Sequence, residues 1–463
     1  MADDLAVWIE GEHAGTLSRD RKGSLRFAYD ETYRNRRGAT PLSRSMPKQQ
    51  AEYGDDVVAP WFDNLLPDDD EVRQRWATDF EAPSPSPFNL LEGMGIDCAG
   101  AVQVVPVGLI PNQTGRHEGV GEAEIEARLA SLRRDVTSWN ADDHGGRWSL
   151  GGAQGKFALA RQQDGSWAAP SGRAASTHIF KVGVARFANA DVAEFVSMRA
   201  AQHLGLSVAA VAIMQFGAQT ALVVERYDRV IDPMGTRRFH QEDLCQALGR
   251  TRKVKYQNDG GPGVADVNKL ISGLHPSDVA PSRELFVRSL IYNWLTAGVD
   301  AHAKNYSLLL VGDRARLAPL YDLTSGSLLL GPEKIFYKGK TAMKIGNDYR
   351  LRNIGRSDLQ RCADEAGVDD ASFMDIVDDY VARIPDAYER AVDEALDAGG
   401  ALIAPGTRDR YLRGIGTTLD LSAGQAGLSR GSRIRQPVER TSANSSEAVS
   451  EISEDVAEGH FDA

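Results

Sequence analysis

The chain is poor in cysteine and has no long apolar run. Its three cysteines, Cys98, Cys245 and Cys362, lie far apart in 463 residues and show no paired spacing. We therefore predict buried, reduced thiols and neither a disulfide nor a zinc site. No stretch approaches the roughly 18 consecutive apolar residues that a membrane span requires. The first residues show no basic region followed by an apolar one, so we expect no signal peptide, a cytoplasmic location and no membrane partner.

Positive charge is also scarce. The 53 lysines and arginines are outnumbered by 65 aspartates and glutamates, which gives a formal net charge of −12. A chain of this charge is not built to coat DNA by itself, so any role at DNA would come through a partner. The hydrophobic fraction of 42% and the charged fraction of 25% are typical of soluble globular proteins. At this length the chain can hold two or three domains.

The N-terminal part favours β structure. Alternating apolar and polar residues over 5–30 predict a small antiparallel β meander. We place a first domain at 1–110, followed by a helix and linker at 111–146. The other elements expected in this part are helices at 68–80, 88–94 and 122–132 and a strand at 101–107.

The remainder changes from strands to helices. A β-rich part at 147–228 precedes a part at 229–420 that we predict to be all-helical, and this order is typical of an α+β, bilobal protein-kinase-like fold. The tail at 421–463 is rich in Ser, Gly, Ala and Glu, so we predict disorder there. The expected strands are 148–161, 178–182, 209–216 and 220–225, and the expected helices are 191–204 (closed by Gly205), 241–248, 264–272, 282–298, 357–366 and 370–398.

Three polar residues in the helical part have the spacing of a phosphotransfer site. Asp300 stands five positions before Asn305, on a loop after a helix, and Asp322 closes a short apolar run downstream. In protein kinases this layout provides a catalytic base and two ligands of Mg²⁺. Asp300 would accept the proton of an attacking hydroxyl, while the oxygens of Asn305 and Asp322 would hold the metal. An acidic loop can produce the spacing between Asp300 and Asn305 by chance. The kinase interpretation therefore depends on whether other kinase-like segments stand earlier in the chain.

A glycine-rich segment at 149–156 is one such part. It differs from a Walker A loop, because Phe157 stands where Ser or Thr is needed, and from G-x-G-x-x-G, because position 153 is Ala. Its glycines would let backbone N–H groups approach phosphates. A plain β-hairpin built from small residues is the alternative interpretation.

The other upstream parts are a lysine, a glutamate and a strand end. Lys181 stands in an apolar strand, where an ammonium needs a partner, and Glu194 lies on the next expected helix. In kinases such a pair orients the ATP phosphates. A lysine reaching solvent from an edge strand and a solvated helix glutamate are the alternatives. Residues 225–228 follow a buried strand at the position of a hinge that offers backbone groups to adenine, although an ordinary strand end would look the same.

Taken together, these segments resemble the HipA toxin kinases of type II toxin–antitoxin systems. The resemblance extends over most of the chain, including the family's N-terminal β-rich subdomain. The segments that carry it are Phe62–Pro67, Ser86–Leu91, Gly100–Gln103, Gly152–Gln154, Lys156, Thr177–Ile179, Lys181, Glu225–Arg229, Gln241–Asp243, Lys255–Tyr256, Asp259–Gly263, Asp300, His302–Asn305 and Tyr321–Asp322.

The resemblance implies a serine/threonine protein kinase with a phosphoinositide-kinase-like core that uses Mg–ATP. It implies Asp300 as the catalytic residue, Asn305 and Asp322 as metal ligands, Glu194 as the ion-pair partner of Lys181, and autophosphorylation at Ser149. The implied ATP-binding residues are Gly151, Gly152, Ala153, Gln154, Gly155, Lys156, Lys181, Glu225, Arg226, Tyr227, His302, Ala303, Lys304, Asn305, Tyr321 and Asp322.

The resemblance also implies partners. These are a HipB-like helix-turn-helix antitoxin, operator DNA reached through that antitoxin, and a protein target of the aminoacyl-tRNA synthetase class, glutamyl-tRNA synthetase in the founding member. The expected outcome is arrest of translation and growth, and persistence. Two positions depart from the familiar pattern, because Gly155 replaces an acidic residue and Tyr227 replaces Phe.

Two other functions are weighed against this one. The same core could phosphorylate a lipid or a small molecule, but no basic amphipathic helix is present to meet a membrane. A catalytically silent corepressor that only binds its antitoxin is the second. The presence of Lys181, Asp300, Asn305 and Asp322 favours an active kinase over this silent corepressor.

Overall fold

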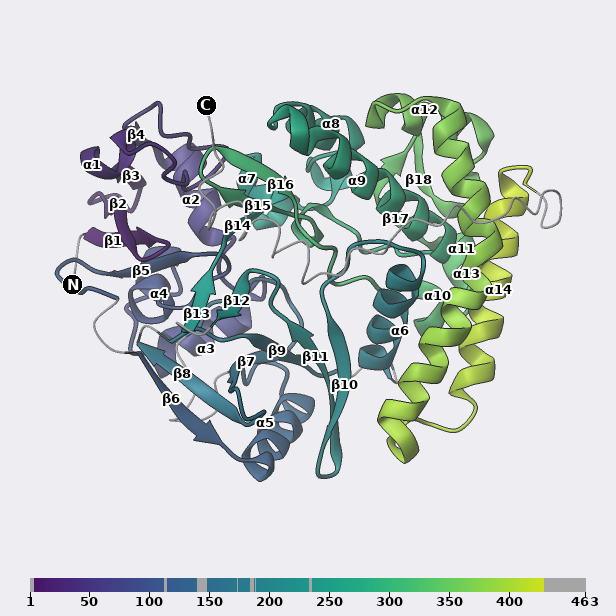
Figure 1. Cartoon of the computed structure of the whole chain (residues 1–463), viewed down its shortest axis with the longest axis horizontal. Helices are drawn as coiled ribbons and strands as arrows, with labels where there is room; N and C mark the ends of the chain where they lie inside the picture. The colour runs from purple at the N-terminus through teal and green to yellow at the C-terminus, as the bar shows by residue number, and fades with distance from the viewer. Residues whose placement is uncertain are drawn as a thin grey trace. The chain divides into compact units, whose positions relative to one another are not determined.

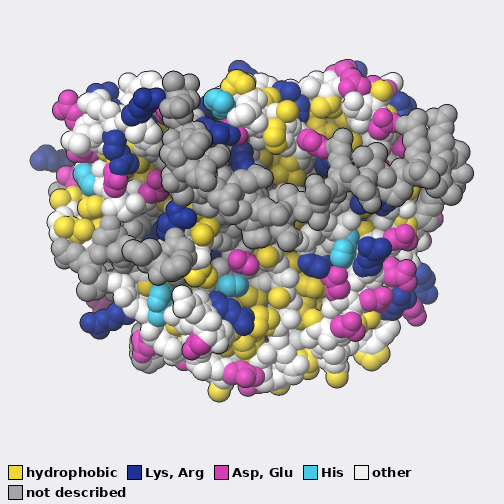
Figure 2. Space-filling view, in the orientation of Figure 1, with side chains coloured by type: hydrophobic (Ala, Val, Ile, Leu, Met, Phe, Trp, Pro, Cys, Tyr) yellow, Lys and Arg dark blue, Asp and Glu magenta, His cyan; other side chains and the backbone are white. Residues whose placement is uncertain are grey.

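The structure is a computed structural model, and it describes residues 4–111, 115–139, 148–172, 174–183, 187, 189–232 and 235–428. The chain forms two compact units. Unit 1 comprises Met1–Val182, Phe216–Lys255 and Ser307–Ala318, and unit 2 comprises Gly183–Gln215, Tyr256–Tyr306 and Pro319–Ala463. Acidic and basic side chains are mixed over the face drawn in Figure 2.

Unit 1 begins with a five-stranded antiparallel sheet in the order β4-β3-β2-β1-β5. The predicted β meander is confirmed, and helix α2 packs on β3 while α4 packs on β5 (Figure 1). Phe27 and Phe62 contact each other in the core with ring centroids 6.4 Å apart. The elements are β1 (Asp4–Ile9), β2 (Glu12–Arg19), β3 (Leu25–Tyr29), α1 (Glu31–Asn35), β4 (Glu52–Tyr53), α2 (Asp55–Asp63), α3 (Asp70–Asp79), α4 (Pro87–Met94) and β5 (Val102–Pro106).

A second sheet of unit 1 contains strands in the order β11-β9-β7-β8-β6. Phe157 of β7 stacks on Phe180 of β9 with ring centroids 4.8 Å apart. The strand predicted from residue 148 is too long, because β7 begins at Lys156 and the residues before it form a loop. The elements are β6 (Gly115–Val120), α5 (Glu122–Arg134), β7 (Lys156–Arg161), β8 (Trp167–Gly172), β9 (His178–Lys181) and β11 (Gln219–Glu225).

Unit 1 closes with a hairpin and a small sheet in the order β14-β15-β16. The helix predicted over 241–248 is wrong in its first half, because His240–Asp243 pairs with β15 as a strand. Asp243 then begins a short helix with a capping box. The elements are β12 (Arg229–Asp232), β13 (Gly235–Arg238), β14 (His240–Asp243), α7 (Leu244–Ala247), η1 (Arg252–Val254), β15 (Ser307–Val311) and β16 (Arg314–Leu317).

Unit 2 is predominantly helical. The long helix α13 packs against α6 and α14, and Figure 1 shows α13 and α14 side by side. Tyr292 of α9 and Tyr388 of α13 stack in the core, and their hydroxyls are 2.8 Å apart. Gly205 ends α6 with a φ of +89°, as predicted for a position that favours glycine. The helices are α6 (Ala190–His203), α8 (Val264–Ser272), α9 (Pro276–Thr296), α10 (Gly326–Leu329), α11 (Pro332–Lys338), α12 (Arg356–Ala366), α13 (Asp370–Gly399) and α14 (Thr407–Gln425).

Short elements interrupt the helices of unit 2, so this part is helical but not exclusively so. They are β10 (Val211–Phe216, whose last residue belongs to unit 1), η2 (Gln257–Asp259), η3 (Ala303–Asn305), β17 (Lys340–Ile345), β18 (Asp348–Arg350), η4 (Leu351–Asn353) and η5 (Gly400–Leu402).

The predicted tail needs correction at its start. Residues 421–425 complete helix α14, which the sequence interpretation did not foresee, and 429–463 lie outside the described residues. The α+β fold class with a β-rich N-terminal part is confirmed. Within the described ranges, no helix is long and apolar enough to cross a membrane.

Candidate functional site

The glycine-rich segment of unit 1 begins at a fully buried serine. The Ser149 hydroxyl donates a hydrogen bond to the carbonyl oxygen of Leu65 at 2.8 Å. Its backbone N–H donates to the carbonyl oxygen of Asp97 at 2.9 Å. Trp148, just before it, stacks on Trp139 with ring centroids 6.2 Å apart. The N-terminal part of unit 1 therefore holds the start of this segment in place.

The glycines that follow form a loop and not a hairpin. Gly152 has a φ of +98°, in the region that favours glycine, and its carbonyl accepts a hydrogen bond from the N–H of Asp68 at 2.8 Å. A Cβ atom at this position would lie 2.6 Å from the ammonium of Lys156. No strand precedes Lys156 within the segment, so the plain-hairpin interpretation is wrong. A glycine-rich loop of this kind can approach a phosphate closely.

Two lysines of unit 1 lie on one face of the second sheet. Lys156 of β7 is directly opposite Lys181 of β9 in the antiparallel register, and both side chains are buried. The Lys156 ammonium donates to the carbonyl of Gly151 at 2.6 Å, and the Gln154 amide donates to the carbonyl of Val182 at 2.8 Å. Two ammonium groups on one face of a sheet can attract an anion. The arrangement suits a phosphate ligand.

The predicted hinge follows strand β11. Glu225 is exposed at the end of the strand, and the backbone N–H of Arg226 donates to the carbonyl of Thr177 at 2.9 Å. The Tyr227 hydroxyl donates to the side chain of Gln241. Burial raises the pKa of Tyr227 above its usual range, so this phenol stays protonated at neutral pH. Tyr227 is thereby anchored inside unit 1.

A buried ionic cluster lies beneath this hinge. Two carboxylates meet three guanidinium groups, with Arg226–Asp228 at 2.9 Å and Arg229–Asp97 at 3.0 Å. Burial alone would raise the pKa of Asp97, but the neighbouring arginines, Arg226 foremost, hold it well below its usual range. The members of this cluster, called the hinge cluster below, are Asp97, Arg226, Asp228, Arg229 and Arg238.

The hinge cluster changes the interpretation of Arg226. All three guanidinium nitrogens donate hydrogen bonds within unit 1, to Asp228, to the hydroxyl of Ser176 and to the carbonyl of Cys98. The Arg226 side chain is therefore held by hydrogen bonds within unit 1, and the assignment of Glu225, Arg226 and Tyr227 to an ATP site stays a prediction. Sequence reasoning missed Asp97, which holds the cluster through its carboxylate and Ser149 through its carbonyl. The charged run directly after an apolar strand could have signalled such a buried network.

The loop after α9, in unit 2, brings together the expected base and one expected metal ligand. The Asn305 amide nitrogen donates to the carbonyl of Asp300 at 2.9 Å, and the His302 N–H donates to the same carbonyl at 2.8 Å. These bonds close the loop into a compact turn. The Asp300 carboxylate is exposed, whereas His302 and Asn305 are buried. Because the amide nitrogen of Asn305 donates this hydrogen bond, the amide oxygen of Asn305 can bind a cation.

Tyr256 is a functional candidate to which sequence reasoning gave no role. Its hydroxyl donates a hydrogen bond to the carboxylate of Asp300. Its ring packs edge-on against His302, with centroids 5.0 Å apart. The phenol therefore orients one oxygen of the carboxylate and leaves the other to a substrate. The segment Lys255–Tyr256 carried part of the family resemblance, and that was the available signal.

The second expected metal ligand stands in an unusual backbone conformation. Asp322 has a φ of +59°, a left-handed conformation that non-glycine residues seldom adopt and that is concentrated at functional sites. The hydroxyl of the preceding Tyr321 donates to the carbonyl of Lys304 at 2.7 Å. This bond ties the Asp322 segment to the loop that carries Asn305.

The oxygen atoms of Asn305 and Asp322 are donors of the type that Mg²⁺ prefers, and one or two such ligands plus substrate phosphates are usual for this ion. In the part of the chain that the structure describes, no group of three or more His, Cys, Asp or Glu residues could hold a metal by itself. Glu194 is buried on α6. Its expected partner Lys181 belongs to the other unit, so that ion pair remains a prediction.

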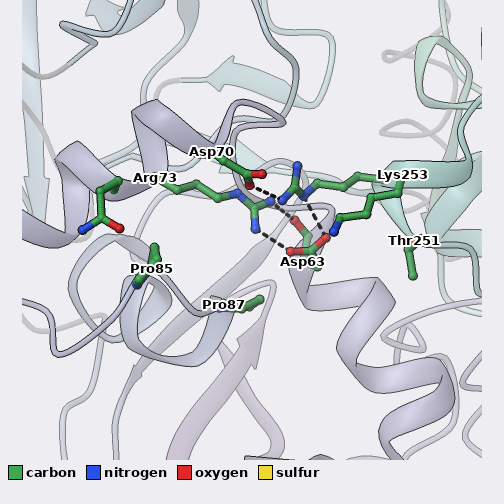
Figure 3. A pocket seen from close by; sticks show the side chains of 9 residues that line it. Asp63, Asp70, Arg73, Pro85, Pro87, Thr251 and Lys253 are labelled. Carbon is green, nitrogen blue, oxygen red and sulfur yellow. Dashed lines mark hydrogen bonds and ion pairs between the residues drawn. The ribbon is translucent and has the colours of Figure 1, made fainter.

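A pocket of about 510 Å³ lies elsewhere in unit 1. Figure 3 shows the ion pair between Asp63 and Arg73 at this pocket. Asp63 and Asp70 each also form an ion pair with Arg252. Arg252 also donates to the carbonyl of Asp68, the residue that holds Gly152. None of the predicted site residues lines this pocket. Four of its charged side chains, Asp63, Asp70, Arg73 and Arg252, are paired with one another, so we assign these ion pairs a structural role in supporting the glycine-rich loop.

Comparisons with known proteins place these features in a family. Residues 5–105 match the HipA N-terminal domain, and residues 148–388 match the HipA-like C-terminal domain. The chain is 34% identical to a Sinorhizobium fredii protein described as "Putative kinase Y4mE", over 92% of this chain and 98% of that protein. It is 28% identical to the serine/threonine-protein kinase toxin HipA of Shewanella oneidensis, over 82% of this chain and 87% of that one.

The fold has a solved counterpart. The structure superimposes with a TM-score of 0.75 on a chain from a complex of Shewanella oneidensis HipA, HipB and their operator DNA, at 24% identity, covering 92% of this chain and 98% of that chain. At this identity the superposition supports the fold, while the domain matches and the sequence relatives carry the family assignment. The chain therefore belongs to the HipA family, whose members include serine/threonine-protein kinase toxins.

Proposed function

We propose that the chain is a Mg–ATP-dependent serine/threonine protein kinase that acts as the toxin of a HipA/HipB-type toxin–antitoxin module. The observation that carries the proposal is the loop of unit 2, in which Tyr256 orients an exposed Asp300 and Asn305 closes the turn behind it. Family membership supports the same reaction, because a relative at 28% identity is named a serine/threonine-protein kinase toxin.

In the proposed reaction, a substrate hydroxyl attacks the γ-phosphorus of ATP. An O–P bond forms to the serine or threonine oxygen, and the P–O bond to the leaving ADP breaks. The Asp300 carboxylate receives the hydroxyl proton. Asn305 and Asp322 would hold Mg²⁺, which neutralises phosphate charge. Lys156 and Lys181 would provide further positive charge for the phosphates, and the backbone of 225–227 would receive the adenine.

Ser149 is the proposed autophosphorylation site. Its hydroxyl is buried against Leu65, so phosphorylation requires the start of the glycine-rich segment to open. A phosphate of about −1.5 to −2 charge has no room at that buried position and would repel the ATP phosphates. We propose that this modification switches the kinase off.

The proposed partners follow from the family. We propose a HipB-like helix-turn-helix antitoxin, with operator DNA reached through it, since the solved counterpart comes from a complex with HipB and operator DNA. The chain would serve as corepressor in such a complex. Its proposed target is an aminoacyl-tRNA synthetase such as glutamyl-tRNA synthetase, and its proposed effect is growth arrest and persistence.

The test is incubation of the purified chain with Mg–ATP, alone and with a cell lysate, followed by mapping of phosphopeptides. We expect phosphate on the Ser149 peptide and on one dominant lysate protein, and neither in a chain carrying Asp300→Asn. ATP binding without any phosphate transfer would contradict the proposal and favour a catalytically silent corepressor.

A further inference from the structure

Six side chains that carry hydroxyl groups are linked by hydrogen bonds in the core of unit 2. None of them is more than 4% exposed, although serine and threonine usually lie at the surface of folded proteins. They come from α6, the end of α9, the start of α10 and α13, which are far apart in the sequence. We call them the hydroxyl cluster, and its members are Ser197, Tyr292, Thr296, Ser325, Ser327 and Tyr388.

Ser325 joins the other members of the hydroxyl cluster. Its backbone N–H donates to the hydroxyl of Ser197 at 2.9 Å, and its own hydroxyl donates to the carbonyl oxygen of Thr296 at 2.5 Å. The Ser327 hydroxyl lies 2.7 Å from that of Ser325 and must be the donor, because the Ser325 proton is already used. Ser325 therefore ties its own segment to both α6 and α9.

Ser197 is held from its other side by the tyrosines of the core. Its hydroxyl donates to the carbonyl oxygen of Ala193 at 2.7 Å, and its carbonyl oxygen accepts from the Tyr292 hydroxyl at 2.6 Å. The Tyr388 hydroxyl lies 2.8 Å from that of Tyr292. Every hydroxyl of the hydroxyl cluster thus has a hydrogen-bond partner, and a buried polar network that is fully satisfied is rigid.

Two residues in left-handed backbone conformations stand next to the hydroxyl cluster. Asp322, the expected metal ligand, precedes Ser325 by three positions and has a φ of +59°, and Ala297 directly follows Thr296 and has a φ of +54°. Such conformations are costly for residues other than glycine and persist only where the surrounding structure over-determines them. The backbone N–H of Gly326 donates to the carbonyl oxygen of Ala297 at 2.9 Å. The two segments are therefore joined at a second point beside Ser325.

The segment that carries Asp322 is fixed on both sides. Before Asp322, the backbone N–H of Leu320 donates to the carbonyl oxygen of Ser207 at 2.9 Å, and the Tyr321 hydroxyl donates to the carbonyl oxygen of Lys304. After Asp322, the hydrogen bonds made by Ser325 hold the chain to α6 and α9. The hydroxyl cluster is therefore the downstream anchor of the unusual conformation at Asp322.

We propose that the hydroxyl cluster positions Asp322 for Mg²⁺ and ties it to the helix that carries Glu194, so that Ser197 and Ser325 are positioning residues of the phosphotransfer site. This inference rests on the proposed kinase function and deepens it. Glu194 precedes Ser197 by three positions on α6, which places the two side chains on one face of the helix. Hydrogen bonds behind a metal ligand commonly set its orientation and the affinity for the metal. Neither serine touches the nucleotide in this scheme, because both act through the backbone of the Asp322 segment.

The test measures how much Mg²⁺ the unphosphorylated full chain needs to bind a fluorescent, non-hydrolysable ATP analogue. Ser325→Ala removes the hydrogen bond to Thr296 and should raise the Mg²⁺ concentration at half-saturation by roughly five- to tenfold. Ser197→Ala leaves the Ser325 N–H buried without an acceptor and should raise it at least as much. Binding of the analogue in the presence of EDTA should match the wild type, because the metal is then absent and the rest of the nucleotide site is unchanged.

The matched control is Ser422→Ala, which removes the same atom from a serine of α14 that is 0% exposed. Among the described residues the Ser422 hydroxyl has no hydrogen-bond partner, so the Mg²⁺ requirement should not change. If a cluster variant fails to fold, Ser327→Ala takes its place, and we expect a rise of roughly two- to threefold because only the hydrogen bond to Ser325 is lost.

An unchanged Mg²⁺ requirement in the folded cluster variants would overturn the inference and leave the hydroxyl cluster as a purely structural network. Equal weakening of analogue binding with Mg²⁺ and with EDTA would overturn it as well, since a general loosening of the fold would act on both. A wild-type chain that binds the analogue no better with Mg²⁺ than with EDTA would instead contradict the kinase proposal, and this inference with it. Urea unfolding of each variant identifies the conditions under which all of them are folded.

Discussion

The two regions that carry the candidate chemistry use charge in opposite ways. In unit 1 the hinge cluster contains five charged side chains, four of them buried and Arg238 half-buried, which pair with one another and donate to backbone carbonyls. In unit 2 the Asp300 carboxylate is exposed and takes its described side-chain hydrogen bond from a single phenol. Paired, buried charges fix a backbone in place, whereas an exposed carboxylate can still exchange a proton. The same residue types therefore serve structure in unit 1 and, under the proposed function, would serve chemistry in unit 2.

The difference leads to opposite expectations for mutations. Removing a charge from the hinge cluster should mainly cost stability, since its partners would remain buried without compensation. Removing the charge of Asp300 should mainly cost activity, since water can solvate whatever it leaves behind. Measuring both quantities for both kinds of variant tests the contrast directly.

The largest expected effect concerns activity. Asp300→Asn keeps the size of the side chain but cannot take the hydroxyl proton, so phosphoryl transfer should fall by about 10²–10⁴-fold. The urea midpoint of unfolding should stay within experimental error of the wild type, because the carboxylate is exposed. Single-turnover transfer to the Ser149 peptide provides the rate. Near-wild-type transfer by this variant would remove Asp300 from the role of base.

A loss of stability should follow from breaking the hinge cluster. Asp97→Asn leaves three arginines, two of them buried, with one carboxylate, and such an imbalance typically costs about 3–5 kcal/mol. Urea unfolding provides the free energy. Asp379→Asn is the matched control, because it breaks an exposed ion pair with Arg383 that is worth about 0.3–0.5 kcal/mol. If the two variants lost equal free energy of unfolding, burial would not determine how much these ion pairs contribute to stability.

The same cluster gives a pH dependence with a definite sign. The pKa of Asp97 is depressed in the folded chain, so its contribution to stability is present above the usual aspartate pKa. This contribution is lost as the pH falls through the depressed value. The stability gap between wild type and Asp97→Asn should therefore be constant near neutral pH and shrink in strong acid. Urea titrations over that range measure it, and a gap that widens on acidification would reverse the assigned direction.

These regions also show what local sequence can and cannot reveal. Helices α8, α12 and α13 were predicted to within one or two residues, because their apolar periodicity and caps are local signals. Strand β14 was mistaken for helix, since its pairing with β15 joins residues that are far apart in sequence. The apolar run of β15 was likewise assigned to no strand, because nothing local reveals its partner.

The residues of the candidate site likewise include some that local sequence could indicate and others that depend on contacts distant in sequence. The spacing of Asp300, Asn305 and Asp322 suggested these residues, and the matching segments upstream gave that spacing its weight. The partners that decide how side chains are used lie far away in the chain. Tyr256 reaches Asp300 across 44 positions, and Arg226 reaches the carbonyl of Cys98 across 128. Such contacts depend on the fold, which explains why Tyr256 received no role and Arg226 was assigned to ATP.

The smallest expected effect concerns Tyr256, whose hydroxyl donates a hydrogen bond to the exposed Asp300 carboxylate. Tyr256→Phe removes one hydrogen bond to a carboxylate but keeps the ring that packs on His302. A hydrogen bond to a charged group is typically worth about 1.5–3 kcal/mol, and an exposed one less, so we expect roughly a tenfold loss of kcat. The KM for ATP should not change, because the phenol orients the base and does not bind the nucleotide.

Tyr337→Phe is the matched control, because Tyr337 is 50% exposed on α11 and the same atom is removed. Steady-state kinetics of both variants, together with Tyr256→Leu, separates orientation from packing. If the phenol orients Asp300, the Phe variant loses kcat at unchanged stability, and the Leu variant loses both. A Phe variant with wild-type kcat would mean that the turn closed by Asn305 holds Asp300 in place without help from the phenol.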